Sequence, residues 1–535
     1  MPTLHWIGKD KVINHHREVP FKVLEHGYGF SAEKGRTKEA TGSGNMVIHG
    51  DNLEALKALL PRYEGRVKCI YIDPPYNTGN EGWVYNDNVN DPRIRRWLNQ
   101  VVGKEGEDLS RHDKWLCMMY PRLVLLHKLL AEDGVIFISI DDNAIAQLKF
   151  LCEEIFGTYN FIANIVWQKR TSPDARLNLG PAHDYILVFA KQKSEFKLNL
   201  VPFSDDRAAA YRNPDNDPRG PWASVDITGQ TGHATASQFY AITSPSGRKM
   251  SPPDGRCWAM AESTFLKLNS EGRIWFGANG TSRPRLKKFL AETEGTTTWT
   301  WWPNTEVGHN QEAAKELAEV LGSAGQFDTP KPSRLVHRIL QLATDKNAII
   351  LDSFAGSGTT AHAVLNLNKQ DGGNRKFILV EMEDYAETIT AERVKRVMQG
   401  FGTGTKAVDG TGGSFDFYTL GPRLFDEQHN LNEEVGVERI REYVWYTETR
   451  TELGGKAPSK ASSDTPYLLG THDGTAYYFI YEQDRLTVLD YDTLALLRTK
   501  AEHYVIYADN CILPQSFLEA HHITFKKIPR DISRF

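Results

Sequence analysis

The stretch Cys69-Ile70-Tyr71-Ile72-Asp73-Pro74-Pro75-Tyr76-Asn77 decides how the whole chain is interpreted. Its apolar first half predicts a buried strand, which the two prolines end because proline neither continues a helix nor donates to a sheet. Asp73 is therefore expected at the carboxyl end of a strand, where open α/β sheets bind their ligands. The carboxylate of Asp73, the carbonyl of Pro74 and the ring of Tyr76 together suit a planar group that carries an NH2. An ordinary strand exit without a ligand is the alternative interpretation.

A second strand end lies far downstream, in Asp352-Ser353-Phe354-Ala355-Gly356-Ser357-Gly358-Thr359-Thr360-Ala361. The apolar run 347–352 predicts a strand, and Gly356 and Gly358 permit a tight turn that a ligand can approach closely. A helix and then a strand over 376–381 are expected to follow. The strand ends in Glu381, 23 residues past Gly358, about where a ribose-binding carboxylate belongs. A structural βαβ unit without a ligand is the alternative.

Length and composition allow two to four domains in a chain of 535 residues with a formal net charge of -5. This charge excludes a protein coated in basic residues, but a local basic groove for nucleic acid remains open. The sequence shows neither a signal peptide nor an apolar run of membrane-spanning length. The five cysteines are scattered and form no Cys-x-x-Cys pair, so we expect no metal site, no disulfide framework and a reducing cytoplasm.

Strands alternating with helices predict a doubly wound α/β sheet built from two separate blocks, 45–194 and 329–425. The predicted strands are 45–49, 67–72, 134–140, 162–168, 184–190, 347–352, 376–381 and 414–420, the last of them on the sheet edge. The predicted helices begin at 52 or cover 115–130, 144–156, 334–343, 360–367 and 385–398. Residues 1–44 are expected to form a polar extension, and 430–535 a small α/β domain.

Residues 195–328 separate the two blocks and have weak periodicity, many prolines and recurring tryptophan and arginine residues. They are interpreted as an inserted region, with the basic patch Arg283, Arg285, Lys287 and Lys288 as its best candidate for DNA contact. A second candidate is the polar loop 77–111, which carries Arg93, Arg95 and Arg96 among aromatic residues. The alternatives are a tryptophan-rich core in the insertion and a loop that packs its own aromatic side chains.

Together the two motifs resemble those of the DNA amino-methyltransferases, a doubly wound, Rossmann-like family. Its members bind S-adenosylmethionine at Phe-x-Gly-x-Gly, matched here by Phe354, Gly356 and Gly358, and the target base at Asp-Pro-Pro-Tyr, matched by 73–76. The base motif comes first, which is the circularly permuted order of the β class, and in that class the target-recognition region lies between the blocks. The resemblance runs from 45 to 425. The tail and overall length resemble the modification subunits of Type III restriction-modification systems.

The resemblance implies methyl transfer from S-adenosylmethionine to N6 of adenine in duplex DNA. The implied catalytic residues are Asp73, Pro74, Pro75 and Tyr76. The predicted cofactor-binding residues are Asp51, Lys331, Asp352, Phe354, Gly356, Gly358, Thr359 and Glu381. Asp73 and the Pro74 carbonyl would accept the two amine hydrogens, and Tyr76 would stack on a base that has left the duplex. For Asp51, capping of the helix that begins at residue 52 is the alternative role.

The sequence is compatible with several functional alternatives. Methylation of cytosine at N4 uses a similar geometry, although Asp rather than Ser at position 73 favours adenine. A DNA-binding specificity subunit without activity is a second alternative. Cytosine C5 methylation is rejected because no cysteine here follows a proline. The sequence has no Gly-x-x-x-x-Gly-Lys-Ser/Thr loop, so cleavage of DNA would depend on a partner restriction subunit, and the tail suggests a homodimer or partner contact.

Overall fold

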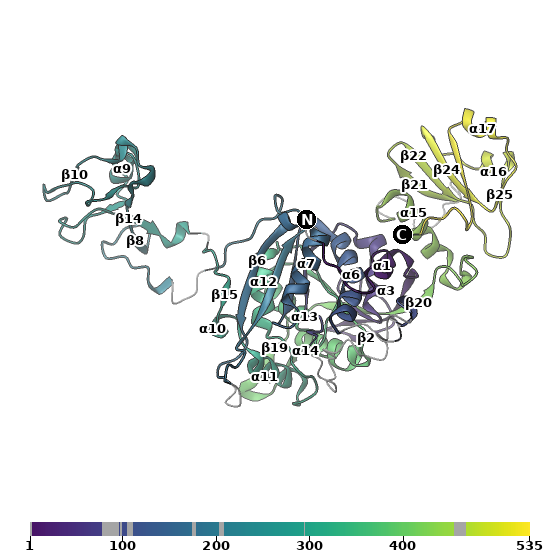
Figure 1. The fold of residues 1–535 in the computed structure, drawn as a ribbon, viewed down its shortest axis with the longest axis horizontal. Helices are drawn as coiled ribbons and strands as arrows, with labels where there is room; N and C mark the ends of the chain where they lie inside the picture. The colour runs from purple at the N-terminus through teal and green to yellow at the C-terminus, as the bar shows by residue number, and fades with distance from the viewer. Residues whose placement is uncertain are drawn as a thin grey trace. The chain divides into compact units, whose positions relative to one another are not determined.

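A computed structural model describes residues 3–77, 96, 99–103, 111–173, 178–202, 208–293, 295–453 and 467–534. Its internal contacts divide the chain into two compact units (Figure 1). Met1–Asn199 and Thr300–Phe535 form the first, which we call the core unit. Leu200–Trp299 form the second, which we call the inserted unit because the core unit precedes and follows it in the sequence.

A mixed sheet of 11 strands forms the centre of the core unit. In spatial order the strands are β15 (Trp301–Trp302), β6 (Phe161–Gln168), β7 (His183–Ala190), β5 (Leu130–Ile140), β4 (Val67–Ile72), β16 (Ile349–Asp352), β17 (Lys376–Glu381), β3 (Met46–His49), β20 (Ser414–Arg423), β1 (Lys22–Ser31) and β2 (Gly35–Thr37). Strands β5, β4, β16, β17, β3 and β20 run parallel. Strand β7 is antiparallel to both of its neighbours, and so is β1.

Helices connect the parallel strands and pack in two groups. The first group is α3 (Asn52–Tyr63), α6 (Arg111–Leu129) and α7 (Ile145–Phe156), and the second is α11 (Asn310–Leu321), α12 (Ser333–Ala343), α13 (Thr359–Asp371) and α14 (Glu392–Gln399). Parallel crossovers are right-handed, and the two groups connect strands in opposite directions along the sheet, so they lie on opposite faces. The predicted doubly wound α/β fold is confirmed.

The direction of winding reverses between β4 and β16. From β4 the chain continues through α6 to β5, whereas from β16 it continues through α13 to β17 on the other side. The two strands are hydrogen-bonded neighbours in parallel register, with Ile350 opposite Cys69 and Leu351 opposite Ile70. Such a switch point leaves a crevice at the carboxyl ends of the strands, because the two connecting segments diverge to opposite faces.

The predicted position of residues 414–420 on the sheet edge is wrong. Strand β20 lies inside the sheet, because β1 from the N-terminal segment pairs with it along most of its length. Tyr28 of β1 stacks on Phe417 of β20, with ring centroids 5.0 Å apart and an interplanar angle of 7°. The charged residues and glycines of Lys22–Ser31 hid this strand in the sequence, although Val23, Tyr28 and Phe30 are buried.

The C-terminal part continues the core unit. Helix α15 (Val437–Thr449) packs against α3, where the Arg62 Nε donates to the Glu442 Oε1 at 2.5 Å, and Tyr443 belongs to the same apolar core as Leu56. A four-stranded sheet follows, in the order β21 (Leu468–His472), β22 (Thr475–Phe479), β24 (His503–Ala508) and β26 (Ile523–Lys527). The remaining short elements of the core unit are α1 (Lys9–Val12), α2 (His15–Glu18), α10 (Asn304–Val307), β18 (Gly400–Phe401), β19 (Val408–Asp409), β23 (Val488–Leu489), α16 (Tyr491–Ala495), β25 (Asn510–Cys511) and α17 (Gln515–Ala520).

The inserted unit is built from short strands around a small apolar cluster that includes the fully buried Trp258. Its elements are β8 (Trp222–Asp226), β9 (Thr228–Gln230), β10 (Ile242–Thr243), β11 (Lys249–Met250), β12 (Arg256–Trp258), α9 (Glu262–Ser270), β13 (Ile274–Trp275) and β14 (Arg285–Phe289). Residues 300–321 carry β15, α10 and α11 and belong to the core unit. The predicted functional boundaries of the insertion, 195 and 328, stay a prediction.

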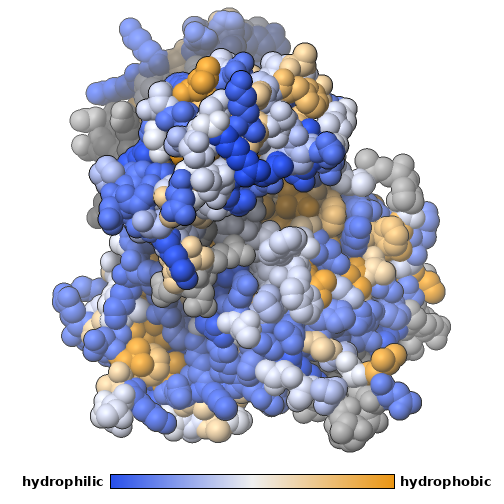
Figure 2. Space-filling view, turned by 90° about the vertical axis from the view of Figure 1, so that its left-hand side faces the viewer, coloured by the Kyte–Doolittle hydropathy of each residue, from blue (hydrophilic) through white to orange (hydrophobic). Residues whose placement is uncertain are grey.

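On the face drawn in Figure 2, hydrophobic residues form small separate patches among hydrophilic ones. Within the described ranges no helix is both long and apolar enough to cross a membrane.

Candidate active site

Two acidic strand ends meet at the switch point of the sheet. Asp73 directly follows β4, and Asp352 is the last residue of the neighbouring β16. Asp73, Asp352 and the glycine turn line one cavity together with Lys331. The fold therefore brings the two predicted motifs, which lie far apart in the sequence, to one crevice.

The turn that follows Asp73 is held by the start of α6. The indole Nε1 of Trp115 donates to the Pro75 carbonyl at 2.6 Å, and the amide nitrogen of Asn77 lies 3.1 Å from the His112 Nδ1. Asn77 has a φ of 63°, a conformation that asparagine tolerates better than most residues. Among the described residues no hydrogen bond occupies the Pro74 carbonyl. Of the two proline carbonyls, the one predicted to bind the amine is thus the one left available.

Lys331 reaches into this turn from the segment before α12. Its ammonium pairs with the Asp73 carboxylate and lies 5.1 Å from the centre of the Tyr76 ring. The side chains of Lys331 and Asp73 are only 9% and 16% exposed. The hydroxyl of Thr359 donates to the Lys331 carbonyl at 3.2 Å, which ties the lysine backbone to the start of α13.

The glycine turn favours glycine at both predicted positions. Gly356 and Gly358 have φ values of 52° and 79°, in the left-handed region that favours glycine. A Cβ on Gly358 would lie 3.0 Å from the Thr390 carbonyl oxygen. The Thr390 hydroxyl in turn donates to the Gly356 carbonyl at 2.6 Å. Thr390 belongs to a π-helical turn, Glu387–Ala391, where the sequence predicts a regular helix.

Two buried carboxylates line the site. Asp352 accepts hydrogen bonds from the Phe354 N–H and the Thr360 hydroxyl, and Glu381 accepts from the Gly356 N–H at 2.7 Å. Burial raises the pKa of Asp352 to about 7, and the negative charge of Asp73 contributes in the same direction. Burial likewise raises the pKa of Glu381 to about 7. Near neutral pH, both carboxyl groups are therefore partly protonated, and a cationic ligand would favour their ionised forms.

Phe354 also lines a second cavity. Its walls combine the apolar side chains of Pro75, Met382 and Tyr385 with the carboxyl group of Glu381. Helix α6 contributes Met118 and Arg122 to the same walls. An aromatic ligand with a polar edge fits this combination of surfaces.

Asn52 and Arg122 are functional candidates that the sequence did not single out as site residues. The Arg122 Nε donates to the Asn52 Oδ1 at 2.5 Å, and the Asn52 amide donates to the Ser353 carbonyl at 3.2 Å. Both side chains are almost fully buried and line the second cavity. An arginine inside the otherwise apolar run of α6 was the available signal, because a buried charge requires partners.

Asp51 caps α3, the alternative role that the sequence left open. Its carboxylate accepts from the Leu53 N–H at 2.9 Å and the Glu54 N–H at 3.2 Å, and it lies 3.6 Å from the Arg122 guanidinium. Its predicted contact with a cofactor stays a prediction.

An ion pair between a buried arginine and a partly buried glutamate supports the glycine turn. Arg393 of α14 is fully buried and donates to the Ser357 and Thr359 hydroxyls at 3.0 and 2.8 Å. Its other guanidinium nitrogen donates to Glu316 of α11 at 3.2 Å, and Glu316 accepts from the Ser333 N–H at 3.1 Å. This network was not predicted, because its members lie on four separate helices.

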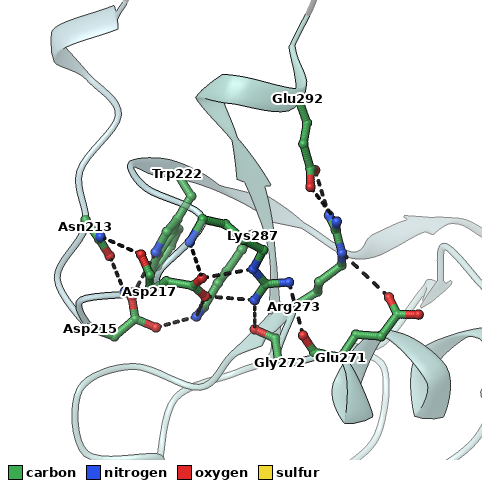
Figure 3. Close-up of polar contacts among 10 residues, drawn as sticks. Asn213, Asp215, Asp217, Trp222, Glu271, Gly272, Arg273, Lys287 and Glu292 are labelled. Carbon is green, nitrogen blue, oxygen red and sulfur yellow. Dashed lines mark hydrogen bonds and ion pairs between the residues drawn. The ribbon is translucent and has the colours of Figure 1, made fainter.

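The predicted DNA-binding residues differ in their surroundings. Arg93 and Arg95 lie outside the described residues, and Arg96 is exposed. In the inserted unit, Arg283, Arg285 and Lys288 are exposed, whereas Lys287 is only 6% exposed. The Lys287 ammonium pairs with Asp215 and Asp217 and lies 5.3 Å from the Trp222 ring centre, and Asp217 also pairs with Arg219 (Figure 3). The DNA contact predicted for Lys287 stays untested, but its observed role is structural.

No group of three or more His, Cys, Asp or Glu side chains among the described residues is arranged to hold a metal ion.

A family match to known proteins covers both strand-end motifs. A family model described as DNA methylase matches residues 67–392, more than half of the chain. The StyLTI Mod subunit, a Type III restriction-modification enzyme of Salmonella typhimurium, is 38% identical over 71% of this chain and 58% of its own length. The EcoP15I Mod subunit of Escherichia coli is 31% identical over 71% of this chain and 64% of its own length. The type II methyltransferase M.KpnI of Klebsiella pneumoniae is 31% identical over 69% of this chain and 89% of its own length.

The match thus spans about three fifths of the length of these two Mod subunits and most of M.KpnI. The family match covers both strand-end motifs and confirms the resemblance predicted from them. With the site at the switch point of a doubly wound sheet, this chain belongs to the DNA methylase family.

Proposed function

We propose that the protein transfers a methyl group from S-adenosylmethionine to N6 of adenine in duplex DNA. One observation carries the proposal. The Asp-Pro-Pro-Tyr turn and the glycine turn follow adjacent parallel strands at the switch point, so a bound base and a bound cofactor would share one crevice. The similarity to enzymes named as Mod subunits and as a methyltransferase supports the same assignment.

The residues of the crevice fit S-adenosylmethionine. Two glycines at positive φ leave backbone open to close approach, and buried acids with pKa values near 7 suit a cation. Glu381 would hold the ribose hydroxyls, while Phe354 and the apolar wall of the second cavity would contact the adenine ring. Further cofactor contacts are proposed for Asp51, Lys331, Asp352, Gly356, Gly358 and Thr359. When bound, the cofactor supplies a methyl group that is already activated on a sulfonium.

The catalytic turn would act mainly by positioning. An exocyclic amine is a weak nucleophile, because its lone pair is conjugated with the ring. Asp73 and the Pro74 carbonyl would accept its two N–H bonds and direct the lone pair away from the ring plane. Pro75 stiffens the turn, and Trp115 fixes its carbonyl. Tyr76 would stack on the extruded base in place of the neighbouring bases of the duplex.

We propose that the protein acts on DNA in the cytoplasm, together with a second copy of the chain or a restriction subunit. The region 195–328 would recognise the target sequence, with Arg283, Arg285 and Lys288 near the DNA backbone. The region 430–535 would bind a second copy or a restriction subunit, in keeping with the similarity to Type III Mod subunits. A cytoplasmic site of action follows from the proposed DNA substrate.

Incubation with labelled S-adenosylmethionine and mixed genomic DNA, followed by nucleoside mass spectrometry, tests the proposal. We expect label in N6-methyladenine, and sequencing of the modified sites would give the recognition sequence. Label in N4-methylcytosine would overturn the choice of base but preserve the mechanism. Absence of label in DNA, with the cofactor bound, would contradict DNA methylation by this chain alone.

Asp73→Asn is the decisive variant in that assay. We expect transfer to fall about a hundredfold or more, because the charged acceptor that orients the amine is lost. Cofactor affinity should change little. Asp141→Asn is the matched control, since Asp141 also follows a parallel strand, β5, but caps its own turn by accepting from the Asn143 N–H at 2.9 Å.

A further inference from the structure

The Lys331 ammonium lies where the target amino group would bind in the proposed reaction. Its ammonium pairs with Asp73 and lies 5.1 Å from the centre of the Tyr76 ring. These are the carboxylate acceptor and the aromatic face that would hold the target amine. The pair is largely buried, so water competes only weakly for either partner.

The chemistry of an ammonium explains why it fits there. It presents several N–H donors to a carboxylate and attracts the face of an aromatic ring, as a polarised amino group also does. Asp73 lies close enough to Asp352 for its charge to act on that second carboxyl. A cation at this point therefore lowers the cost of keeping carboxylates in a buried crevice.

The backbone of Lys331 is anchored while its side chain is long. Its carbonyl accepts from Thr359, and Ser333, two residues later, donates through its N–H to Glu316. The four-carbon stem can thus move the ammonium without moving the turn. The ion pair can be exchanged for another donor at the cost of one side-chain rearrangement.

We propose that Lys331 is a placeholder for the target amino group, so that a base must displace the lysine ammonium from Asp73 in order to be held for methylation. This inference rests on the proposed function. It adds a second role to the cofactor contact expected for Lys331, and it makes the lysine a determinant of specificity. A base without the amino group cannot replace the ammonium. A base with the amino group gains only the difference in binding free energy between its own contact with Asp73 and the contact of the lysine ammonium.

The experiment compares the affinity of the protein for two duplexes without cofactor. Both carry the recognition sequence found by sequencing, one with adenine at the target position and the other with purine, which lacks the amino group. The quantity measured is the ratio of the two dissociation constants, purine over adenine, at pH 8. If the modified base is cytosine, 2-pyrimidinone takes the place of purine.

Lys331→Met should raise this ratio about tenfold over wild type, because the amine then binds Asp73 without displacing a cation. Lys331→Arg keeps a cation beside the carboxylate and should leave the ratio near or below that of wild type. Lys315→Met is the matched control, since Lys315 is an exposed lysine of α11, and it should also leave the ratio unchanged. Thermal unfolding would confirm that each variant is folded.

An unchanged or lower ratio in folded Lys331→Met would overturn the placeholder role. If wild type nevertheless transfers methyl groups to DNA, the proposed function stands and only this inference fails. If the sole effect of Lys331→Met is weaker binding of S-adenosylhomocysteine, Lys331 is a cofactor contact and not a placeholder.

Discussion

Gly358 directly precedes α13 in a conformation that few other residues adopt, and a Cβ added to it would lie 3.0 Å from the Thr390 carbonyl oxygen. Gly358→Asp should reduce affinity for S-adenosylhomocysteine at least about a hundredfold, because it adds both a steric conflict and a charge beside buried acids. Gly372→Asp is a matched control at the other end of the helix, with a φ of 68° and no atom within 4 Å of the added Cβ. It carries the same backbone strain and should bind the ligand normally. If calorimetry shows that both variants lose the same affinity for S-adenosylhomocysteine, backbone strain alone explains the effect.

The pKa values of Asp352 and Glu381 predict how cofactor binding depends on pH. Burial raises both pKa values to about 7, above the ordinary values of 3.8 and 4.5. Protonation of these groups therefore stabilises the folded state at low pH. Their contribution to the free energy of unfolding is lost as pH rises from about 4 through about 7. A cationic ligand stabilises the ionised forms, so affinity for S-adenosylmethionine should rise between pH 6 and pH 8 and then level off.

Calorimetry in buffers of different ionisation enthalpy would measure the accompanying proton release. Glu381→Gln should remove part of the pH dependence that wild type shows. Affinity that is flat across this range in wild type, with no proton release, would contradict the assigned pKa values.

At the scale of elements, strand β14 carries two neighbouring lysines in different surroundings, the buried Lys287 and the exposed Lys288. Side chains alternate along a strand, and Lys287 points into the ion-pair cluster while Lys288 is exposed. Lys287→Met should destabilise the inserted unit by about 3 kcal/mol, because it leaves the buried carboxylate of Asp217 with one cation fewer. Lys288→Met should change stability by less than about 0.5 kcal/mol and weaken DNA binding, with a salt slope smaller by about one.

Thermal unfolding and salt-dependent DNA binding, measured on both variants, separate the two roles. A stable Lys287→Met variant with weakened DNA binding would reverse the assignment and restore the contact predicted from the sequence.

The helix predicted over 385–398 shows why local patterns do not decide an element completely. Its first part is a 3-10 turn, Asp384–Ala386, followed by the π turn Glu387–Ala391, and only then by α14. The widened turn places the Thr390 hydroxyl on Gly356 and its carbonyl against Gly358. Apolar periodicity predicts that a helix exists, but a contact with a distant turn alters its winding.

At the scale of the whole molecule, the N-terminal segment completes the sheet. Strand β1 covers the edge of β20, and Lys22 pairs with Glu54 of α3 at 2.7 Å. Deletion of residues 1–44 should expose the backbone edge of β20 and its aromatic residues, giving aggregated protein. Sedimentation and solubility measurements on the truncated protein test this. A soluble truncated protein with unchanged thermal unfolding would mean that residues 1–44 are not needed to complete the sheet.

Covalent geometry and short-range pattern account for the features that could be predicted from the amino-acid sequence. The prolines after Asp73, the glycines at 356 and 358, and the strand periodicity limit the backbone locally, so both turns and the doubly wound class could be predicted. The partners of Lys331 and Lys287, the position of β20 inside the sheet and the pKa values of the buried acids emerged only from the folded chain. Those properties depend on residues that are distant in the sequence. Asp73 and Lys331 are separated by 258 positions, and only packing of the whole core sets their distance and their burial.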